Sequence, residues 1–254
     1  MTWTESVSAS FRARHDADHA DDAHQVLLSL ERARERLTPT FPRAPGEVTV
    51  VLHTGPIALS LSHPLLPVMW LATAPAARRY VAGWAGHGEL HMLTPSALRE
   101  RASNVPGSRE MLALTGACLY ARLTISRGNP DLRRVMTPVR MRRELRWAWL
   151  VEGSARWYGG QTAHARPAVA RRLREGSGMR SISFPPGVRD APLLGGTLLD
   201  LLAAERGDRA VARLCQRLPR TGARGALVQA FGGGTAKALE QRWRAHLQDV
   251  AAAV

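Results

Sequence analysis

The sequence predicts an α+β fold, in which a small N-terminal mixed β-sheet with helices is followed by a mostly helical C-terminal half. Before residue 95 several short segments alternate between apolar and polar side chains, whereas after residue 106 apolar residues recur at intervals of three and four. Prolines bound the connection between the two patterns. We therefore expect an N-terminal α/β subdomain over residues 1–105 and a helical subdomain over 106–254, packed as one compact domain.

Two strands and one helix are expected in the first 53 residues. Ser8–His15 alternates loosely and predicts a strand. Asp16–Leu37 predicts a helix, because acidic residues lie in its first turns and apolar residues recur along one side. Glu47–His53 is rich in β-branched residues and gives the clearest strand signal. The His- and Asp-rich segment His15–His24 contains donors for a metal ion, but we interpret it as an acidic helix start with exposed histidines.

The next segments are less regular. Ile57–Ala74 predicts an apolar loop or a short helix, and its prolines argue against a membrane span. Arg78–Val81 is a candidate start of another strand, and the alternating segment Gly86–Thr94 predicts one. On that strand His87 and His91 would share a face but lie about 13 Å apart, too far to ligate one ion. We therefore expect no metal there.

Helices dominate the second half. The expected segments, chosen by apolar spacing and start signals, are Ser108–Ile125, Arg140–Tyr158, Leu193–Glu205, Arg209–Arg217 and Ala223–Leu247. The last segment is interrupted at Phe231–Gly234, after which Thr235 is expected to cap a closing helix.

The net charge of +14 raises the possibility of nucleic-acid binding. All but one of the 35 cationic residues are Arg, which reflects genomic base composition as much as selection for phosphate contacts. No zinc-finger spacing, RNA-binding aromatic strand or Gly-rich phosphate loop accompanies them. We interpret the densest cluster, Arg140, Arg142, Arg143 and Arg146, as a solvated basic face and do not expect nucleic acid as a partner.

Cysteine usage and the N-terminal residues bear on location. The two cysteines, Cys118 and Cys215, provide neither a disulfide framework nor a thiolate zinc cluster. The first residues lack the basic start and apolar run of a signal peptide. We expect a cytoplasmic, reduced protein without a membrane partner.

The most informative segment is Trp147–Gly160, which holds three of the seven Trp residues. Its apolar residues recur at helical spacing, and Glu152 lies just beside that apolar face. A carboxylate next to a buried aromatic stripe is costly unless it is paired or bound. One interpretation is a core helix in which Glu152 pairs with Arg156 one turn later. The other is a functional carboxylate.

Trp149–Ala155, with the sequence Trp-Leu-Val-Glu-Gly-Ser-Ala, resembles the third-ligand helix of the gluzincin zinc peptidases, the thermolysin and aminopeptidase type with a peptidase MA-like domain. The order of strands, long helix, Glu motif and helical tail is also similar. The resemblance implies that Glu152 occupies the position of the glutamate that binds zinc. It would then point into a cleft and face the helix Ser108–Ile125.

The chain departs from this family where the other ligands belong. The family carries His-Glu-x-x-His on the earlier helix, yet no histidine occurs between His91 and His164. Aligning the family's lead-in with residues 111–113 places Leu114 and Cys118 at the histidine positions and Thr115 at the general base. A second register keeps Glu110 as a glutamate but supplies no ligand.

A further departure is Arg156, which stands where the family has an acid that orients a histidine. Its guanidinium could neutralise Glu152 without zinc and would repel a dication. We therefore expect zinc to be absent and any catalytic role of Glu152 to be a relic. The residues expected around the cleft are Arg156, Tyr158, Arg109, Arg122, His87 and His91.

Three functions remain open. The favoured one is a catalytically inactive metallopeptidase-like domain that binds a peptide or protein in the former active-site cleft, with Gly86–Thr94 as a sheet edge for main-chain pairing. The second is a hydrolase that uses Glu110, Glu152 and Cys118, with His87 or His91 as a base. The third is an Arg-mediated binder of nucleic acid or of an acidic surface.

Overall fold

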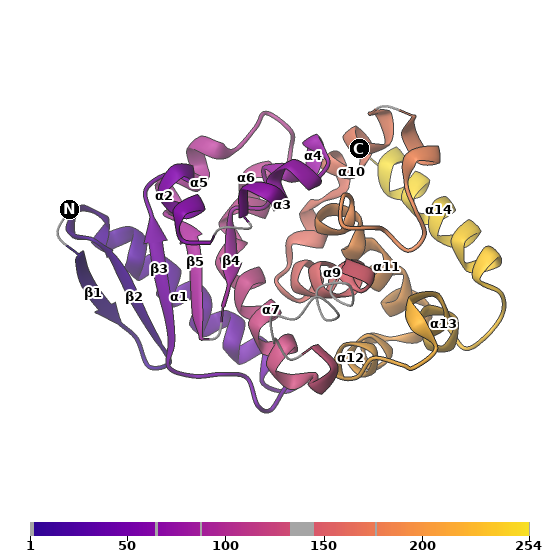
Figure 1. The fold of residues 1–254 in the computed structure, drawn as a ribbon, viewed down its shortest axis with the longest axis horizontal. Helices are drawn as coiled ribbons and strands as arrows, with labels where there is room; N and C mark the ends of the chain where they lie inside the picture. Colours follow the sequence, from indigo (N-terminus) through magenta and orange to yellow (C-terminus); the bar gives the residue numbers. More distant parts are fainter. Residues whose placement is uncertain (1–2, 64–65, 87, 133–144, 176, 254) are drawn as a thin grey trace.

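The computed structural model describes residues 3–63, 66–86, 88–132, 145–175 and 177–253, and it has the predicted α+β fold. A five-stranded sheet lies at one end of the molecule, and helices make up the rest (Figure 1). The strands are β1 (Trp3–Val7), β2 (Phe11–Asp16), β3 (Val48–His53), β4 (Gly83–Ala85) and β5 (Glu89–Leu93).

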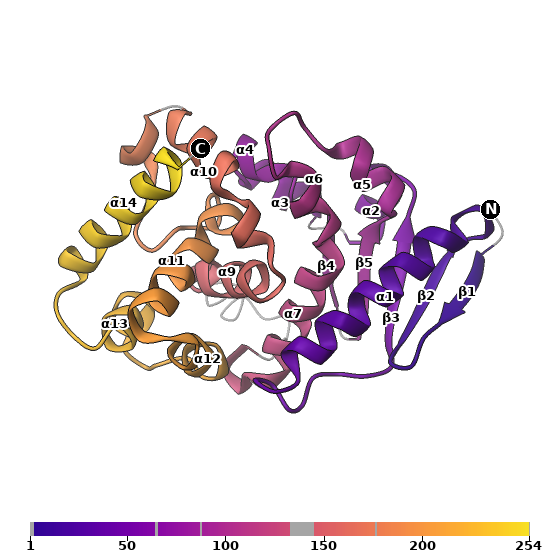
Figure 2. The same ribbon diagram turned by 180° about the vertical axis from the view of Figure 1, so that it is seen from behind.

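The sheet is mixed, with the order β1-β2-β3-β5-β4. Strands β2, β3 and β5 run parallel, whereas β1 and β4 pair antiparallel at the two edges. Burial alternates along β2, where Phe11 and Ala13 point into the core and Arg12 and Arg14 are exposed. Figure 2 shows α1 crossing this sheet on the buried side.

Thirteen α-helices are assigned within the described residues. Their bounds are α1 (Ala20–Leu37), α2 (Pro56–Leu61), α3 (Leu66–Ala72), α4 (Pro75–Arg78), α5 (Pro95–Arg101), α6 (Ser108–Ala113), α7 (Thr115–Gly128), α9 (Ala148–Tyr158), α10 (Arg166–Arg174), α11 (Ala191–Arg206), α12 (Asp208–Gln216), α13 (Gly222–Ala230) and α14 (Ala236–Ala252). None of these helices combines the length and apolar character needed to cross a bilayer, judged on the residues described.

Helix α7 joins the sheet to the helical half. It packs against α1, β4 and β5 on one side and against α9 on the other (Figure 1). The ring of Tyr120 meets Phe11 of β2 edge-on, with 5.0 Å between centroids, and its hydroxyl donates to the carbonyl of Pro45 at 2.7 Å. Because α7 is buried on several sides, its side chains are held in fixed positions against both halves of the fold.

Helices α9 and α11 form the closest helix pair of the second half. A Cβ atom built on Gly153 would lie 2.4 Å from the carbonyl carbon of Gly195, and one on Gly195 would lie 2.5 Å from the carbonyl oxygen of Trp149. Glycine at both positions therefore allows the two backbones to touch. This contact fixes the position of α9, which carries Glu152.

Several expected segments are confirmed with small shifts. The helix expected at Asp16–Leu37 is a short 3₁₀ turn followed by α1, and the strand Glu47–His53 is β3. The interrupted segment Ala223–Leu247 is α13 and α14, and the Thr235 side chain caps α14 by accepting from the Ala238 N–H at 3.1 Å. The helix expected at Arg140–Tyr158 contains α9, while its first part, residues 140–144 with three arginines of the basic cluster, lies outside the described residues.

Other expectations are wrong. Arg78–Val81 does not open a strand, because Pro75 starts α4 and helical turns continue to Val81, where its N–H reaches the carbonyl of Arg78. For Ile57–Ala74 the short-helix alternative is the correct one, because the described residues of this segment form α2 and α3. The expected helix Ser108–Ile125 is divided at Leu114, which belongs to neither α6 nor α7. Strand β1 and helices α5 and α10 were not predicted.

Candidate functional site around Glu152

Glu152 of α9 forms ion pairs with two arginines. The Arg122 guanidinium, on α7, donates from Nη1 to Glu152 Oε1, and Arg156 Nη2 lies 3.8 Å from Oε2. The Glu152 side chain is only 14% exposed, and the two arginine side chains are 17% and 10% exposed. The expected pairing of Glu152 with arginine is thus confirmed, and Arg122 from the facing helix is the closer partner.

Arg156 also connects three neighbouring segments. Its Nη1 donates to the carbonyl of Tyr80 at 2.9 Å and to Oε1 of Gln161, and Gln161 in turn donates to the carbonyl of Met111 on α6. These contacts hold the Arg156 guanidinium beside the Glu152 carboxylate and beside the segment that precedes β4. The Nε atoms of Arg122 and Arg156 are buried and have no hydrogen-bond partner within the described part of the chain.

The cluster Arg122–Glu152–Arg156 borders a small cavity of about 20 Å³. Its walls come from α7, α9, the strand β4 with the residues before it, and α3. The lining residues are Met69, Tyr80, Val81, Ala82, Gly83, Thr115, Cys118, Leu119, Arg122, Glu152, Ala155 and Arg156. A space of this size holds about one water molecule, so neither a peptide nor a side chain fits inside.

Four side chains of α7 face this cavity, namely Thr115, Cys118, Leu119 and Arg122. Their spacing of three, four and seven residues is that of one helical face. The Thr115 hydroxyl donates to the carbonyl of Leu112 at 2.6 Å, so its hydrogen is directed to the backbone. Arg122 lies one turn beyond Cys118 on this face, and it is the α7 residue that contacts Glu152.

Cys118 is a poor nucleophile in this position. Its side chain is buried, and burial raises the pKa of the thiol to about 12. The thiol therefore stays protonated at neutral pH, and none of the residues around the cavity is a histidine that could serve as its base.

The remaining predicted site residues lie elsewhere. Leu114 and Glu110 do not line the cavity, because Leu114 sits at the break between α6 and α7 and Glu110 is exposed on α6. Arg109 is also exposed on α6. Tyr158 packs edge-on against Phe41 and Trp157, and burial raises the pKa of its hydroxyl. The lining residues that were not predicted are Met69, Tyr80, Val81, Ala82, Gly83, Leu119 and Ala155; the sequence around β4 has no apolar–polar alternation that would have identified Gly83 as part of a strand.

The strand expected to be the sheet edge is not the edge. The segment Gly86–Thr94 contains β5 (Glu89–Leu93), which pairs with β3 on one side and β4 on the other. The edge is β4, whose short connection to β5 folds back so that the Gly86 N–H donates to the carbonyl of Glu89 at 2.7 Å. Since Gly83 lines the cavity, this edge strand lies beside Glu152.

His91 belongs to a second polar cluster. Its Nδ1 lies 3.1 Å from His53 Nε2 and its Nε2 lies 3.3 Å from a carboxylate oxygen of Glu89, while the Trp84 ring stacks on it at 4.3 Å. Burial, with a contribution from His91, lowers the pKa of His53 to about 4. Burial also lowers the pKa of His91, although Glu89 opposes this. His53 was not among the predicted residues, and His87 lies outside the described residues.

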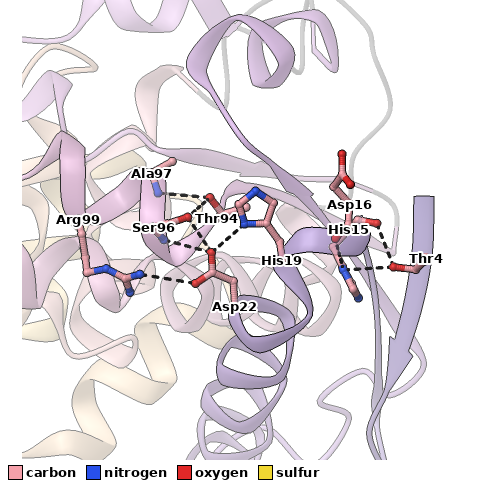
Figure 3. A network of polar contacts seen from close by, with 9 residues as sticks. All are labelled: Thr4, His15, Asp16, His19, Asp22, Thr94, Ser96, Ala97 and Arg99. Carbon is pink, nitrogen blue, oxygen red and sulfur yellow. Dashed lines mark hydrogen bonds and ion pairs between the residues drawn. The ribbon is translucent and has the colours of Figure 1, made fainter. Parts of the chain in front are cut away.

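The segment His15–His24 is divided between two structural networks (Figure 3). His15 contacts Thr4 and Ser6 of β1 and the carbonyl of Asp16. It is buried, so the expectation of exposed histidines is wrong for this residue. Asp22 accepts from the Ser96 hydroxyl at 2.7 Å and lies 3.2 Å from His19, so it links α1 to α5. Among the residues that the structure describes, no group of three or more His, Cys, Asp or Glu side chains is placed to hold a metal ion.

No family model, no curated protein and no solved structure matches this chain. The resemblance to the gluzincin peptidases therefore rests on the motif Trp149–Ala155 and on the order of the elements, with no matching protein to support it.

Proposed function

We propose that this protein is a catalytically inactive relative of the gluzincin peptidases that binds a peptide or protein segment at the mouth of the Glu152 cavity. The observation that carries the proposal is the pairing of Glu152 with Arg122 and Arg156, where an active relative would have zinc. On this proposal the arginines replace the metal as the positive charge that the buried carboxylate requires.

The charge of the cluster favours this interpretation over a metalloenzyme. Two guanidinium groups face one carboxylate, so the cluster carries a net positive charge. A divalent cation entering this cavity would meet repulsion in a poorly hydrated space, where charge interactions are stronger than in water. Histidine, the usual second ligand type of such a zinc site, does not occur among the lining residues.

The shape of the site favours binding at its surface. Since the cavity has room for about one water molecule, a partner would lie over it, along the edge strand β4 and the neighbouring helix α3. An edge strand offers main-chain groups for pairing with an extended segment. The buried, protonated Cys118 and the backbone-bonded Thr115 supply no evident nucleophile for hydrolysis of such a segment.

The test combines binding and cleavage in one set of samples. A displayed library of random dodecapeptides is selected on the purified protein, and enriched peptides are then synthesised. We expect reproducible enrichment and intact peptides by mass spectrometry after incubation with the protein and added zinc. Cleavage that is lost in Glu152→Gln would contradict the proposal, as would a failure to enrich any peptide.

A further inference from the structure

Helix α3 exposes apolar side chains next to the Glu152 cavity. Of its seven residues only Leu66 is buried, whereas Val68 is 58% and Leu71 is 76% exposed. The preceding helix α2 exposes Ile57 and Leu61 to 78% and 82%. Exposed aliphatic side chains concentrated in this way on two consecutive short helices are typical of a binding surface.

A groove lies beside α3. It has a volume of about 440 Å³ and is lined by Pro67, Trp70, Leu71, Arg78 and Arg101. The indole N–H of Trp70 donates to the carbonyl of Val81 at 2.8 Å, and the Arg101 guanidinium carbon lies 5.7 Å from the Trp70 ring centroid. The groove therefore has a fixed aromatic wall and enough space for large side chains of a ligand.

Arg78 and Arg101 line this groove, and Arg79 is hydrogen-bonded to Arg101. Arg101 donates to the carbonyls of Arg79 and Arg78 at 2.7 and 3.3 Å, while Arg79 donates to the carbonyl of Arg101 at 3.5 Å and Arg78 to that of Thr73 at 3.4 Å. None of the three forms an ion pair with any carboxylate in the described ranges, and the buried Nε of Arg78 has no partner there. We call Arg78, Arg79 and Arg101 the arginine cluster.

The positive charges of the arginine cluster repel one another. Burial lowers the pKa of Arg101, and the nearby charge of Arg79 lowers it further. By comparison, Arg99 of α5 lies 3.8 Å from the carboxylate of Asp22. Like charges held together beside a half-buried aromatic ring are stabilised when an anion binds them, and guanidinium groups bind carboxylates with paired hydrogen bonds.

We propose that the groove between α3 and the arginine cluster binds an acidic amphipathic peptide segment, with an aromatic or aliphatic side chain against Trp70 and Leu71 and carboxylates on Arg78 and Arg101. This inference rests on the proposed function, because it names the chemistry of the partner. Met69 of α3 lines the Glu152 cavity and its neighbours line the groove, so one extended segment can contact both.

A peptide fits these observations better than a membrane surface. A membrane requires apolar side chains that project from a surface, with cations flanking them at the headgroup level. Ile57, Leu61 and Val68 do project in this way, but Arg78 and Arg101 are walls of a concave groove, together with Trp70 and Leu71. A groove of this composition suits a single apolar anchor with an adjacent carboxylate.

The experiment uses the peptides enriched from the random dodecapeptide library, labelled with fluorescein and titrated by fluorescence anisotropy. We expect the enriched sequences to carry Asp or Glu close to Trp, Phe or Leu. Replacing their acidic residues by Asn or Gln should weaken binding at least about tenfold. Leu71→Asp and Arg78→Gln should weaken binding similarly. The matched controls are Val7→Asp, which alters a 71% exposed side chain on β1, and Arg43→Gln in the loop before β3; they should leave binding unchanged.

Two outcomes would overturn the inference while leaving the proposed function intact. The first is enrichment of peptides without acidic residues. The second is binding that neither Leu71→Asp nor Arg78→Gln weakens, with both variants folded by circular dichroism. Binding to vesicles of phosphatidylcholine and phosphatidylglycerol that Leu71→Asp abolishes, without peptide binding, would favour a membrane surface and overturn both proposals. Cleavage of the peptides would overturn the proposed function, and the Leu71→Asp comparison would still decide where they bind.

Discussion

Arg122 donates a hydrogen bond to Glu152 across the interface between α7 and α9. The two residues are 30 positions apart in the sequence, and the bond lies in a partly buried setting where water competes weakly. Arg156, one turn along α9, provides a second positive charge. Glu152 is therefore held by the two helices between which the gluzincin resemblance places a metal site.

Removing Arg122 should destabilise the fold. In Arg122→Ala, Glu152 loses its closest partner while still buried, and we expect a loss of roughly 3 kcal/mol in the free energy of unfolding. Replacing both residues, Arg122→Leu with Glu152→Leu, should recover part of this loss. Urea denaturation measures the free energy of unfolding of the single and the double variant. Arg12→Ala is the control, since Arg12 and Glu5 form an exposed pair at 3.8 Å that should contribute less than about 1 kcal/mol. Equal losses in the two single arginine variants would show that the Glu152 pair behaves like a surface pair.

Apolar spacing and helix-start signals predicted most of this fold because they act locally. The first turns of α1, the Thr235 cap of α14 and the strand Val48–His53 are each specified by residues that are close together in the sequence. The break at Leu114 could not be found this way, because residues on both sides continue an apolar helical pattern. Strand β1 and the edge position of β4 depend on pairing with distant strands, which alternation does not specify.

The candidate site was predicted only in part for the same reason. Glu152 and Arg156 were identified from one helical turn, and Arg122 from the expected facing helix. The contribution of Tyr80–Gly83 and Met69 requires the sheet and α3 to meet α7, a contact between segments distant in sequence. His53 was missed because its partner His91 lies on a neighbouring strand.

The glycine contact between α9 and α11 should not tolerate a methyl group. In Gly195→Ala the new Cβ would lie 2.5 Å from the carbonyl oxygen of Trp149, so the helices must separate. We expect a loss of about 1–3 kcal/mol or more by urea denaturation. Gly46→Ala is the control, because no atom lies within 4 Å of its Cβ position. If Gly195→Ala and Gly46→Ala have the same free energy of unfolding, the close contact between α9 and α11 is not present in solution.

The His53 cluster predicts a pH dependence of stability. The pKa of His53 in the folded protein, about 4, lies below its ordinary value of 6.5, so the unfolded chain binds more protons between these values. The free energy of unfolding is therefore highest, as far as His53 is concerned, above about pH 6.5. It decreases as the pH falls toward 4, by at most about 1.4 kcal/mol per pH unit. His53→Gln should flatten this slope, which urea denaturation at several pH values measures, whereas the exposed His164→Gln should not. An unchanged slope in His53→Gln would contradict the assignment.

Binding to duplex DNA should be weak and independent of sequence, because the arginine content lacks an accompanying recognition motif. Fluorescence anisotropy with two unrelated labelled duplexes at about 150 mM salt measures this. Tight binding that is lost on replacing Arg140, Arg142, Arg143 and Arg146 would instead support a nucleic-acid function.

Zinc titration by isothermal calorimetry, followed by elemental analysis after dialysis, tests the central claim most directly. With Arg122 and Arg156 on the Glu152 carboxylate, we predict no stoichiometric zinc in the native protein. The control is Glu152→Gln, which should give the same isotherm. About one zinc per chain in the native protein, lost in Glu152→Gln, would show that Glu152 is a metal ligand and would contradict the account.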